Sequence, residues 1–379
     1  MTLISLPATP IRVELGPTFL FAGGGSGGHL MPGLAVAHQI RASLPHSRII
    51  FVGSGRAIES TVLAHSGFEH LSLPLEPSTS LRGNPVRFAY KNGKALQAAV
   101  RLLREKSPAA VIGLGGYASV PLVAAASMTG VRRILMEQNI VPGRATSWLS
   151  RTASLVCTSF EETAELLPRS VATQCTGNPV DQTVAALHAQ SFGRSRTSIL
   201  VLGGSQGARG VNQLALVAAE RLRDRLAGWR IIHQTGSADV EMVRDRYQTL
   251  GIDAEVRAFF NDLPEHYRSA GFAVTRAGAT SLAELACAAV PAICIPYPGA
   301  IRDHQTKNAL HLAKYGAADV ISERSETATG AITAAMERLL SDAAKRRKMA
   351  AAMAKLARPN ASQRVCEAIL DTAAARHAA

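Results

Sequence analysis

Two segments of this chain, about half its length apart, follow the same pattern. The first is Thr18–His29 (TFLFAGGGSGGH) and the second is Ser198–Arg209 (SILVLGGSQGAR). In each, an apolar run of strand length leads into a glycine-rich turn and then into a helical pattern of apolar residues. A strand, a glycine loop and a helix in this order open a doubly wound α/β domain. Because the pattern occurs twice, it predicts two Rossmann-like domains within the 379 residues.

Further apolar runs alternate with helical patterns in both halves. This alternation predicts parallel sheets that are covered by helices on both faces. We therefore place an N-terminal domain at residues 1–182, a C-terminal domain at 183–345, and a helical segment at 346–379 that packs back on the first domain. Ligands of such sheets bind at the carboxyl ends of the strands, so the cleft between the domains is the expected site. The expected buried strands are 48–52, 109–114, 133–136, 155–158, 230–234, 272–275 and 292–295.

The charge balance favours an anionic partner. The formal net charge is +13, which draws a protein to nucleic acid, anionic lipid or phosphorylated substrates, or only keeps it soluble. Aromatic residues make up 5% of the chain, which argues against a stacking surface for single-stranded nucleic acid. We therefore expect no nucleic-acid partner.

Cysteine and hydropathy patterns point to a reduced compartment and to peripheral membrane contact. The five cysteines are an odd number without a CxxC pair, so neither a disulfide framework nor a zinc site is predicted. The charge-free stretches 107–131 and 285–301 are interrupted by proline and glycine. Each of them therefore predicts a strand, a loop and part of a helix, and not a membrane span.

The first glycine loop ends at His29, which is a candidate general base. The loop formally satisfies GxGxxG, whose glycines let the backbone approach a phosphate at a helix N-terminus. A dinucleotide site also needs an acidic residue after the next strand, and none follows before Glu59. A histidine at a helix start within a cleft can accept a proton, because its ordinary pKa is near 6.5. The alternatives are a turn needed only for packing and a structural histidine.

The second glycine loop and the segment after the strand at 272–275 indicate a diphosphate and ribose site. Gly203–Gly207 lacks the Walker lysine, so it is not an ATPase loop. In the segment 277–284, Glu284 could accept hydrogen bonds from ribose hydroxyls while the helix N-terminus faces a diphosphate. The alternative is a capping box, with Ser281 as the cap and Glu284 at its third position.

Polar residues also follow two strands of the first half. Glu137-Gln138-Asn139 comes directly after the strand at 133–136, and Tyr117 follows the strand at 109–114. No Asp-x-Asp motif occurs, so we expect no metal and no cofactor, and the leaving-group charge must be met by helix dipoles and amides.

Together these motifs resemble the MurG family of bacterial peptidoglycan glycosyltransferases, which belong to glycosyltransferase family 28. The resemblance spans nearly the whole chain in the family's order. The most specific pieces are GGSQGAR and RAGATSLAE. The matching segments are 23–37, 113–121, 137–139, 176–180, 202–209, 275–286 and 303–309.

The resemblance implies a GT-B fold and the inverting transfer of N-acetylglucosamine from UDP-N-acetylglucosamine to the C4 hydroxyl of undecaprenyl-diphospho-N-acetylmuramoyl-pentapeptide (lipid I), giving lipid II. His29, Glu137 and Tyr117 would lie on the acceptor side, with His29 as the first candidate for the base and Glu137 as the second. The residues that would bind substrates are Ser26, Gly27, Gly28, Asn139, Ser205, Gln206, Phe260 (through its backbone), Ala279, Thr280, Ser281, Leu282, Ala283, Glu284 and Gln305.

This chain departs from the family at two places. The family commonly has arginine directly after GNPV, where this chain has Asp181, so a contact with the diphosphate is in doubt. The loop 76–87 is shorter than the family's glycine- and arginine-containing loop. Two alternative functions remain: a UDP-N-acetylglucosamine 2-epimerase, and a non-catalytic protein that binds nucleotide sugars or lipids.

A lipid-linked acceptor implies work at the cytoplasmic face of the bacterial inner membrane, in cell-wall growth and hence in cell division and cell shape. The segment 86–104 has apolar residues at Val86, Phe88, Tyr90 and Leu96 among several basic ones. A helix with an apolar and a basic face binds an anionic membrane surface in its plane. The alternative is an ordinary surface helix whose apolar side faces the core. The basic residues are Arg87, Lys91, Lys94, Arg101 and Arg104.

Overall fold

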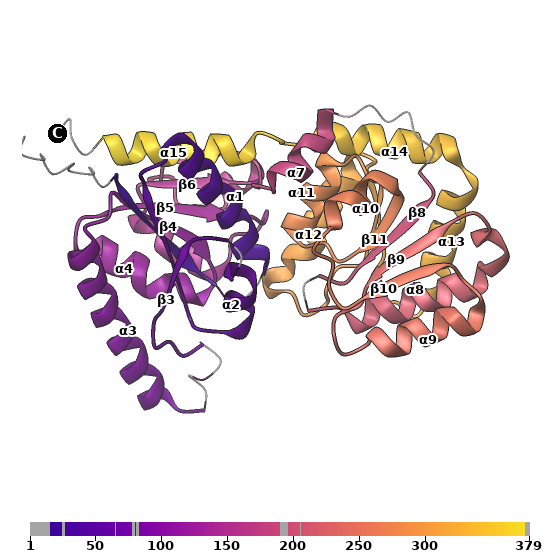
Figure 1. The fold of residues 1–379 in the computed structure, drawn as a ribbon, viewed down its shortest axis with the longest axis horizontal. Coiled ribbons are helices and arrows are strands. Elements are labelled where there is room, and N and C mark those ends of the chain that lie inside the picture. Colours follow the sequence, from indigo (N-terminus) through magenta and orange to yellow (C-terminus); the bar gives the residue numbers. More distant parts are fainter. Residues whose placement is uncertain are drawn as a thin grey trace, which may run out of the picture.

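The chain folds into two α/β domains that lie side by side, each around one parallel sheet (Figure 1). The computed structural model describes residues 16–24, 27–64, 66–77, 80, 83–189, 196–204 and 206–375. The two Rossmann-like domains expected from the repeated pattern are thereby confirmed. Among the described helices, none combines the length and the apolar character needed to cross a bilayer.

The N-terminal sheet has seven parallel strands in the order β3-β2-β1-β4-β5-β6-β7. The interior strand β1 is buried along Phe19–Gly23, because helices cover both faces of the sheet. The strands are β1 (Thr18–Gly23), β2 (Arg48–Gly53), β3 (Glu69–Ser72), β4 (Ala110–Gly115), β5 (Arg132–Glu137), β6 (Leu155–Thr158) and β7 (Thr173–Cys175). The helices are α1 (Gly27–Ser43), α2 (Ala57–Leu63), α3 (Pro85–Lys106), α4 (Val120–Met128), α5 (Arg144–Leu149) and α6 (Glu162–Glu165).

The C-terminal sheet has six parallel strands in the order β10-β9-β8-β11-β12-β13. Its strands are β8 (Ser198–Leu202), β9 (Arg230–Gln234), β10 (Ala254–Arg257), β11 (Ala270–Thr275), β12 (Ala292–Cys294) and β13 (Ala318–Val320). The remaining helices are α7 (Gln182–Ala185), α8 (Arg209–Arg221), α9 (Val240–Leu250), α10 (Leu263–Ser269), α11 (Ala279–Cys287), α12 (His304–Lys314), α13 (Ala328–Ser341), α14 (Ala343–Leu356) and α15 (Ala361–Ala374).

In both sheets the strand order reverses next to the first strand of the domain. β1 lies between β2 and β4, and β8 lies between β9 and β11. The loops after β1 and β4 therefore flank one switch point, and those after β8 and β11 flank the other. Ligands of doubly wound sheets bind at such points, so the topology selects the same glycine loops as the sequence did.

The polypeptide crosses between the domains twice, at adjacent places. The first crossing passes Gly177, whose φ is +86°, and the second passes Arg358. A Cβ on Gly177 would lie 2.5 Å from the Arg358 Cβ, so only glycine lets the two crossings approach this closely. Val180 already packs in the core of the C-terminal domain, and Ser362 Oγ donates to its carbonyl at 3.1 Å.

The C-terminal segment that was expected to pack back on the first domain divides between the two domains. Met353 of α14 is buried in the core of the C-terminal domain, whereas Val365 and Ile369 of α15 are buried in the core of the N-terminal domain. α15 lies across the N-terminal domain in Figure 1, next to α1. The expectation for 346–379 therefore has to be corrected for its first helix.

Candidate active site at the domain boundary

The first glycine loop positions His29 in the first turn of α1. Gly115 and Gly116, after β4, have φ of +97° and +72° and lie against the imidazole ring. A Cβ on Gly115 would lie 3.2 Å from His29 Cδ2, and one on Gly116 would lie 3.5 Å from Nδ1. The two glycines therefore make room for the ring, which is how the loops after β1 and β4 jointly define the first half of the site. Ser26 lies outside the described residues.

The surroundings of His29 favour its neutral form. Burial lowers the pKa of His29 from 6.5, the Glu137 carboxylate opposes that change, and His304 of the C-terminal domain lowers the pKa further. A neutral imidazole at pH 7 can accept a proton. Electrostatic interaction with His304 also indicates that α12 approaches the first half-site from the other domain.

Glu137, the second candidate for the base, is buried and holds the loop that follows β5. Its Oε1 accepts from the Asn139 backbone N–H at 3.0 Å and from Asn139 Nδ2 at 3.3 Å, and its Oε2 accepts from the Gly143 N–H at 2.9 Å. These bonds fix the loop 137–143 beside His29. Tyr117 is half-buried at the start of a short 3-10 turn and directly follows Gly116, which lies against the His29 ring.

The second glycine loop is held by a residue that the sequence analysis missed. The buried Gln234, at the end of β9, donates from Nε2 to the Gly204 carbonyl at 3.0 Å and accepts at Oε1 from the Phe260 N–H at 3.0 Å. It therefore joins the glycine loop to the segment that contains Phe260, whose backbone was expected to bind the substrate. Gln206 is exposed in this loop, and Ser205 lies outside the described residues.

Helix α11 points its N-terminus at the first half-site. It begins at Ala279, and Thr280 Oγ1 donates to the Gly28 carbonyl at 3.1 Å. Gly27 is buried in the first turn of α1, whereas Gly28 is exposed and a Cβ there would meet nothing within 4 Å. The N-termini of α1 and α11 thus meet across the domain boundary, which is where an anionic ligand would lie.

The capping-box alternative for this helix is wrong. The N-cap is Gly278, Ser281 lies inside the first turn, and Glu284 faces away from the cap. Its Oε2 accepts a hydrogen bond of 2.8 Å from the Tyr267 hydroxyl. Burial raises the pKa of Glu284 to about 7, the Tyr267 hydrogen bond opposes this, and the Asp181 carboxylate raises it further. Glu284 therefore accepts a hydrogen bond from Tyr267 and does not cap the helix.

Asp181 stands where the resembling family has arginine, and here it caps a helix. It is the N-cap of α7, and its Oδ1 accepts from the Thr183 N–H at 2.8 Å and from the Thr183 hydroxyl at 2.5 Å. Its negative charge therefore adds to that of Glu284 and cannot neutralise an anionic ligand, as the arginine of the resembling family could. Gln305, in the first turn of α12, accepts at Oε1 from the Tyr297 N–H at 2.8 Å.

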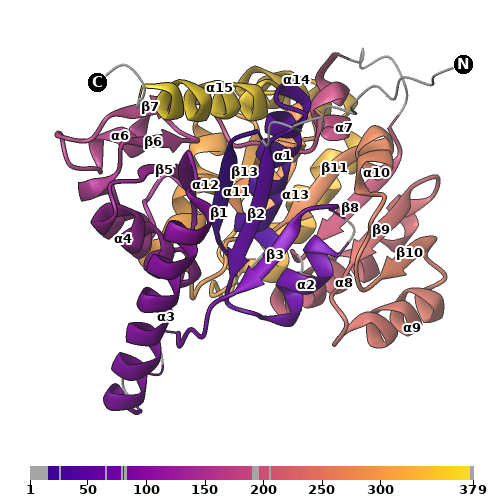
Figure 2. The ribbon, with the colours of Figure 1, turned by 60° about the vertical axis from the view of Figure 1, so that its left-hand side comes forward.

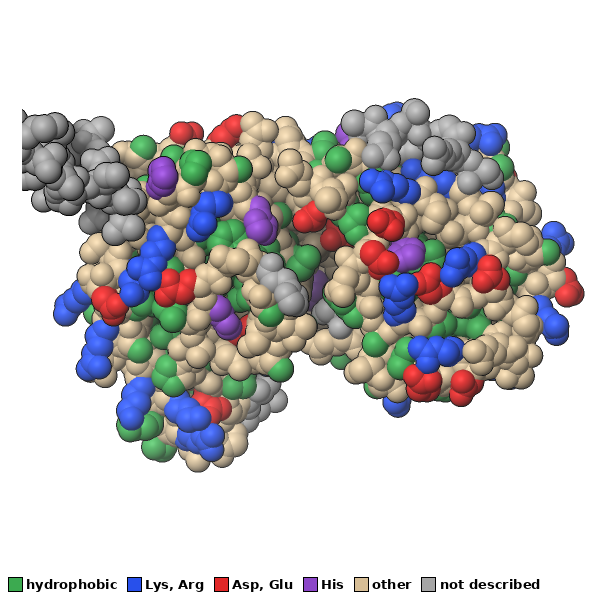
Figure 3. Space-filling model, viewed as in Figure 1, with side chains coloured by type: hydrophobic (Ala, Val, Ile, Leu, Met, Phe, Trp, Pro, Cys, Tyr) green, Lys and Arg blue, Asp and Glu red, His purple; other side chains and the backbone are tan. Residues whose placement is uncertain are grey.

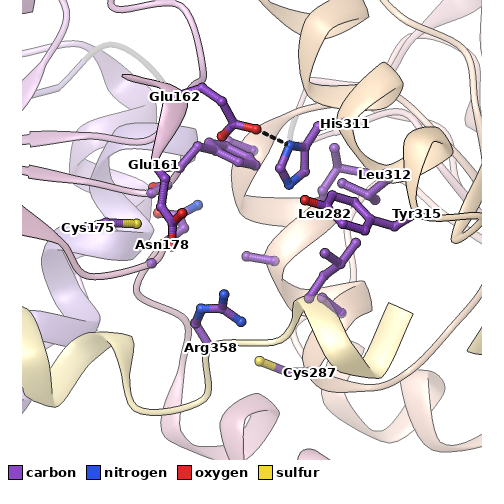
Figure 4. A pocket seen from close by; sticks show the side chains of 17 residues that line it. Glu161, Glu162, Cys175, Asn178, Leu282, Cys287, His311, Leu312, Tyr315 and Arg358 are labelled. Atoms are coloured by element: carbon purple, nitrogen blue, oxygen red, sulfur yellow. Dashed lines mark hydrogen bonds and ion pairs between the residues drawn. The ribbon is translucent and has the colours of Figure 1, made fainter. Parts of the chain in front are cut away.

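A cavity of about 150 Å³ opens between the domains behind α11 (Figure 4). Arg358 enters it from the second crossing, and at its edge a Glu162–His311 hydrogen bond of 3.1 Å joins the two domains. Of the residues expected to bind substrates, Ala279, Leu282 and Ala283 line this cavity with one face of α11. Within the described ranges, no group of three or more His, Cys, Asp or Glu side chains is arranged to hold a metal ion.

Comparisons with known proteins agree with this geometry. Residues 19–158 match the glycosyltransferase family 28 N-terminal domain, and residues 198–365 match the C-terminal domain of that family. A protein of Myxococcus xanthus named UDP-N-acetylglucosamine–N-acetylmuramyl-(pentapeptide) pyrophosphoryl-undecaprenol N-acetylglucosamine transferase is 36% identical over 357 residues. That alignment covers 93% of this chain and 92% of the relative.

Solved structures show the same two-domain arrangement. MurG of Acinetobacter baumannii superposes with a TM-score of 0.74 at 28% identity, covering 94% of this chain and all of that one. A UDP-N-acetylglucosamine 2-epimerase of Neisseria meningitidis, bound to UDP-N-acetylglucosamine, gives a TM-score of 0.67 at 13% identity over 93% of this chain. The expected GT-B fold is therefore confirmed, and the epimerase shares the fold alone.

Proposed function

Because this chain belongs to glycosyltransferase family 28, along with N-acetylglucosamine transferases that match nearly its whole length, we propose that the boundary between its domains transfers N-acetylglucosamine from UDP-N-acetylglucosamine to lipid I. The chain is a hexosyltransferase of the MurG type in peptidoglycan synthesis. The epimerase and the non-catalytic alternatives are not favoured, since the relatives of high coverage are named as transferases.

One observation supports the proposal at the level of residues: Thr280, in the first turn of α11, contacts Gly28, the residue directly before His29, across the domain boundary. In the proposed step, the C4 hydroxyl of the acceptor sugar gives its proton to His29 and its oxygen bonds to the anomeric carbon. The bond from that carbon to the diphosphate oxygen breaks, and the electron pair leaves with UDP. The amides of the Gly203–Gly207 loop and of α11 meet the charge that develops there.

The test of this function is an assay with labelled UDP-N-acetylglucosamine, with and without lipid I. We expect label to enter the lipid fraction only when lipid I is present, together with an equal amount of UDP. Release of UDP without the acceptor, or conversion of the sugar to its 2-epimer, would instead support the epimerase. Binding of the donor without turnover would support the non-catalytic alternative.

Transfer is expected to proceed without a metal ion. The proposal assigns the leaving-group charge to backbone amides and to the α11 dipole, which need no cation. Rates measured in excess EDTA should therefore equal rates measured with added magnesium. A loss of more than about tenfold in EDTA, restored by magnesium, would show that the diphosphate needs a cation.

Donor binding is expected to strengthen as the pH rises through about 7. Glu284, with its pKa raised to about 7, must be ionised to accept strongly from the ribose hydroxyls. Below that pKa, the affinity for UDP should fall by up to about tenfold per pH unit.

The raised pKa of Glu284 also affects stability. The free energy of unfolding of the unliganded protein should decrease as the pH rises from 4.5 to about 7, because the folded state disfavours the ionised carboxyl.

The variant Asp181→Asn tests whether the pH dependence of UDP binding comes from Glu284 and not from another titrating group. Asparagine still caps α7 but carries no charge, so the midpoint of UDP binding should move to lower pH. Isothermal titration at several pH values measures both proteins. A midpoint that is the same in Asp181→Asn and in the wild type would show that Asp181 does not act on Glu284.

The described α3 helix supports membrane contact through its first turns. These turns project beyond the N-terminal domain (Figures 1 and 2), with Val86 78% and Tyr90 61% exposed. Figure 3 shows Lys and Arg side chains gathered on this projection. Glu76 offsets part of the charge, since it pairs with Arg87 at 3.0 Å and with Lys91 at 2.9 Å.

The apolar face of the rest of α3 is not turned outward as expected, although Arg101 and Arg104 are exposed. Ala95, Ala99 and Leu103 are buried, and Leu96 packs against the same core. Leu96 therefore has to be removed from the expected membrane face, and only the end near Val86 and Tyr90 remains available. We propose that this end meets the anionic, cytoplasmic face of the inner membrane, where the lipid acceptor presents its headgroup.

Charge reversal on this end of α3 is expected to weaken binding to anionic vesicles. Each basic residue near such a surface contributes about 1 kcal/mol, so Arg87→Glu/Lys91→Glu/Lys94→Glu should lower vesicle binding by about tenfold or more. Co-sedimentation with anionic and with neutral vesicles measures this. Lys345→Glu/Arg347→Glu/Lys348→Glu, on α14, changes the net charge equally and serves as the matched control. An equal loss in both variants, or binding that ignores lipid charge, would place the contact elsewhere.

A further inference from the structure

Asn308 of α12 is a buried amide that bridges the two domains. Its Oδ1 accepts from the Ile140 N–H at 3.1 Å, in the loop after β5 of the N-terminal domain. Its Nδ2 donates to Asn139 Oδ1 at 3.0 Å, in the same loop, and to the Ala277 carbonyl at 3.2 Å in its own domain. The side-chain amide of Asn308 thus accepts one hydrogen bond at Oδ1 and donates two from Nδ2.

The partner side chain continues the connection toward His29. Asn139 Nδ2 donates to Glu137 Oε1 at 3.3 Å, and the Glu137 carboxylate acts electrostatically on His29. At the other end, Ala277 lies two residues before the first residue of α11. A continuous series of polar contacts therefore runs from the acceptor-side carboxylate to the start of the helix that faces the diphosphate.

The same face of α12 carries further contacts to the N-terminal domain. His311, three residues after Asn308, pairs with Glu162 at 3.1 Å and stacks edge-on against Phe160 with ring centroids 5.0 Å apart. Residues three apart lie on one face of a helix. α12 therefore rests on the N-terminal domain along a line of contacts, and Asn308 is its buried member.

We propose that Asn308 and Asn139 are positioning residues that align His29 with the N-terminus of α11. This inference rests on the proposed function and differs from the expectation that Asn139 contacts a substrate. No other side chain of similar size both accepts one bond and donates two, so a replacement leaves buried polar groups of the loop or of Ala277 unpaired. Each half-site then stays folded, but the distance between base and donor is no longer fixed. A displacement of about 1 Å can lower a rate by about a hundredfold.

The test uses Asn308→Ala, Asn139→Ala and the double variant in the full chain. Leu310→Ala is the matched control, because Leu310 is on the same helix and 52% exposed. We expect kcat to fall at least about tenfold in each single variant, with no further fall in the double variant, because the two residues act as one unit. The Kd for UDP should stay within about twofold of the wild type, because the donor half-site is intact.

Hydrogen exchange tests the pair without any assay of transfer. Asn308→Ala removes the acceptor of the Ile140 N–H, so amide exchange in residues 138–143 should become faster. Asn139→Ala should change it less, since Ile140 keeps its partner, and Leu310→Ala should leave it unchanged. Hydrogen exchange can be measured even if the wild type fails to transfer sugar to lipid I. A failure of the proposed function can therefore be distinguished from a failure of the Asn308–Asn139 proposal.

Three outcomes would overturn the positioning role. Losses that multiply in the double variant would show that the two residues act independently. A UDP affinity that collapses together with kcat would make Asn308 a donor contact. Unchanged exchange in residues 138–143 of Asn308→Ala would show that the bridge is not formed in solution. If Asn308→Ala does not fold, the kcat and the UDP affinity of Asn139→Ala test the same role, because Asn139 is only half-buried.

Discussion

Replacing His29 with alanine is expected to lower kcat by about 10²–10⁴-fold while the affinity for UDP stays within about twofold of the wild type. The reason is positional: in the proposed function His29 serves the acceptor side, whereas the donor is assigned to the glycine loop after β8 and to helix α11, which belong to the other domain. Steady-state kinetics with lipid I and titration with UDP alone measure the two quantities separately.

The pH profile gives an independent check on His29. Its pKa is lowered below 6.5, chiefly by burial, so the neutral base should persist to moderately acidic pH. The rate should therefore fall as the pH decreases through a value below 6.5, and this limb should disappear in His29→Ala. Glu137→Gln is the companion variant, because Glu137 was the second candidate for the base.

Two results would count against His29 as the base. If UDP affinity collapses along with turnover, His29 is a donor ligand or a structural residue. If turnover survives in His29→Ala and is lost in Glu137→Gln, the proton goes to Glu137. The second result would be unexpected, because the Glu137 oxygens already accept bonds from Asn139 and Gly143.

The interior of both sheets could be predicted from the sequence, and their edges could not. All seven expected strands form, with ends that differ by at most two residues. The repeated pattern also predicted β1 and β8. The strands that were missed are β3, β7, β10 and β13, and each of them lies at the edge of its sheet. Edge strands pair on one side only and can carry charged residues, as Glu255 and Arg257 of β10 show. They therefore lack the continuous apolar run that identifies a central strand.

The site was predicted where glycine patterns mark it and missed where distant residues meet. The loops at 23–28 and 203–207 follow from local sequence because glycine is needed for their turns. Gln234 lies outside the matching segments, and Asn308 lies within the segment 303–309, but neither position indicates its partners, because those partners lie 26 or more residues away. Leu96 was wrongly assigned to the membrane face for a related reason. A periodic apolar face does not reveal which part of a long helix packs against the protein core.

Removing the carboxylate in Glu284→Ala is expected to weaken donor binding by roughly 10- to 150-fold, because a buried hydrogen bond to a charged group is worth about 1.5–3 kcal/mol. Affinity for the acceptor should change little, because Glu284 lies in the C-terminal domain and contacts Tyr267 there. Titration with UDP measures the first quantity, and the KM for lipid I at saturating donor measures the second.

Two variants distinguish a ligand contact from a structural role for Glu284. Tyr267→Phe removes the 2.8 Å hydrogen bond to Glu284 Oε2 but keeps the carboxylate, so UDP should still bind. Because that hydrogen bond lowers the pKa of Glu284, its loss should move the midpoint of UDP binding to higher pH. Ser281→Ala should have little effect on stability, since Ser281 is inside α11 and does not cap it. If Glu284→Ala lowers only the melting temperature while UDP affinity is retained, the carboxylate serves the fold and the ribose must be held by other residues.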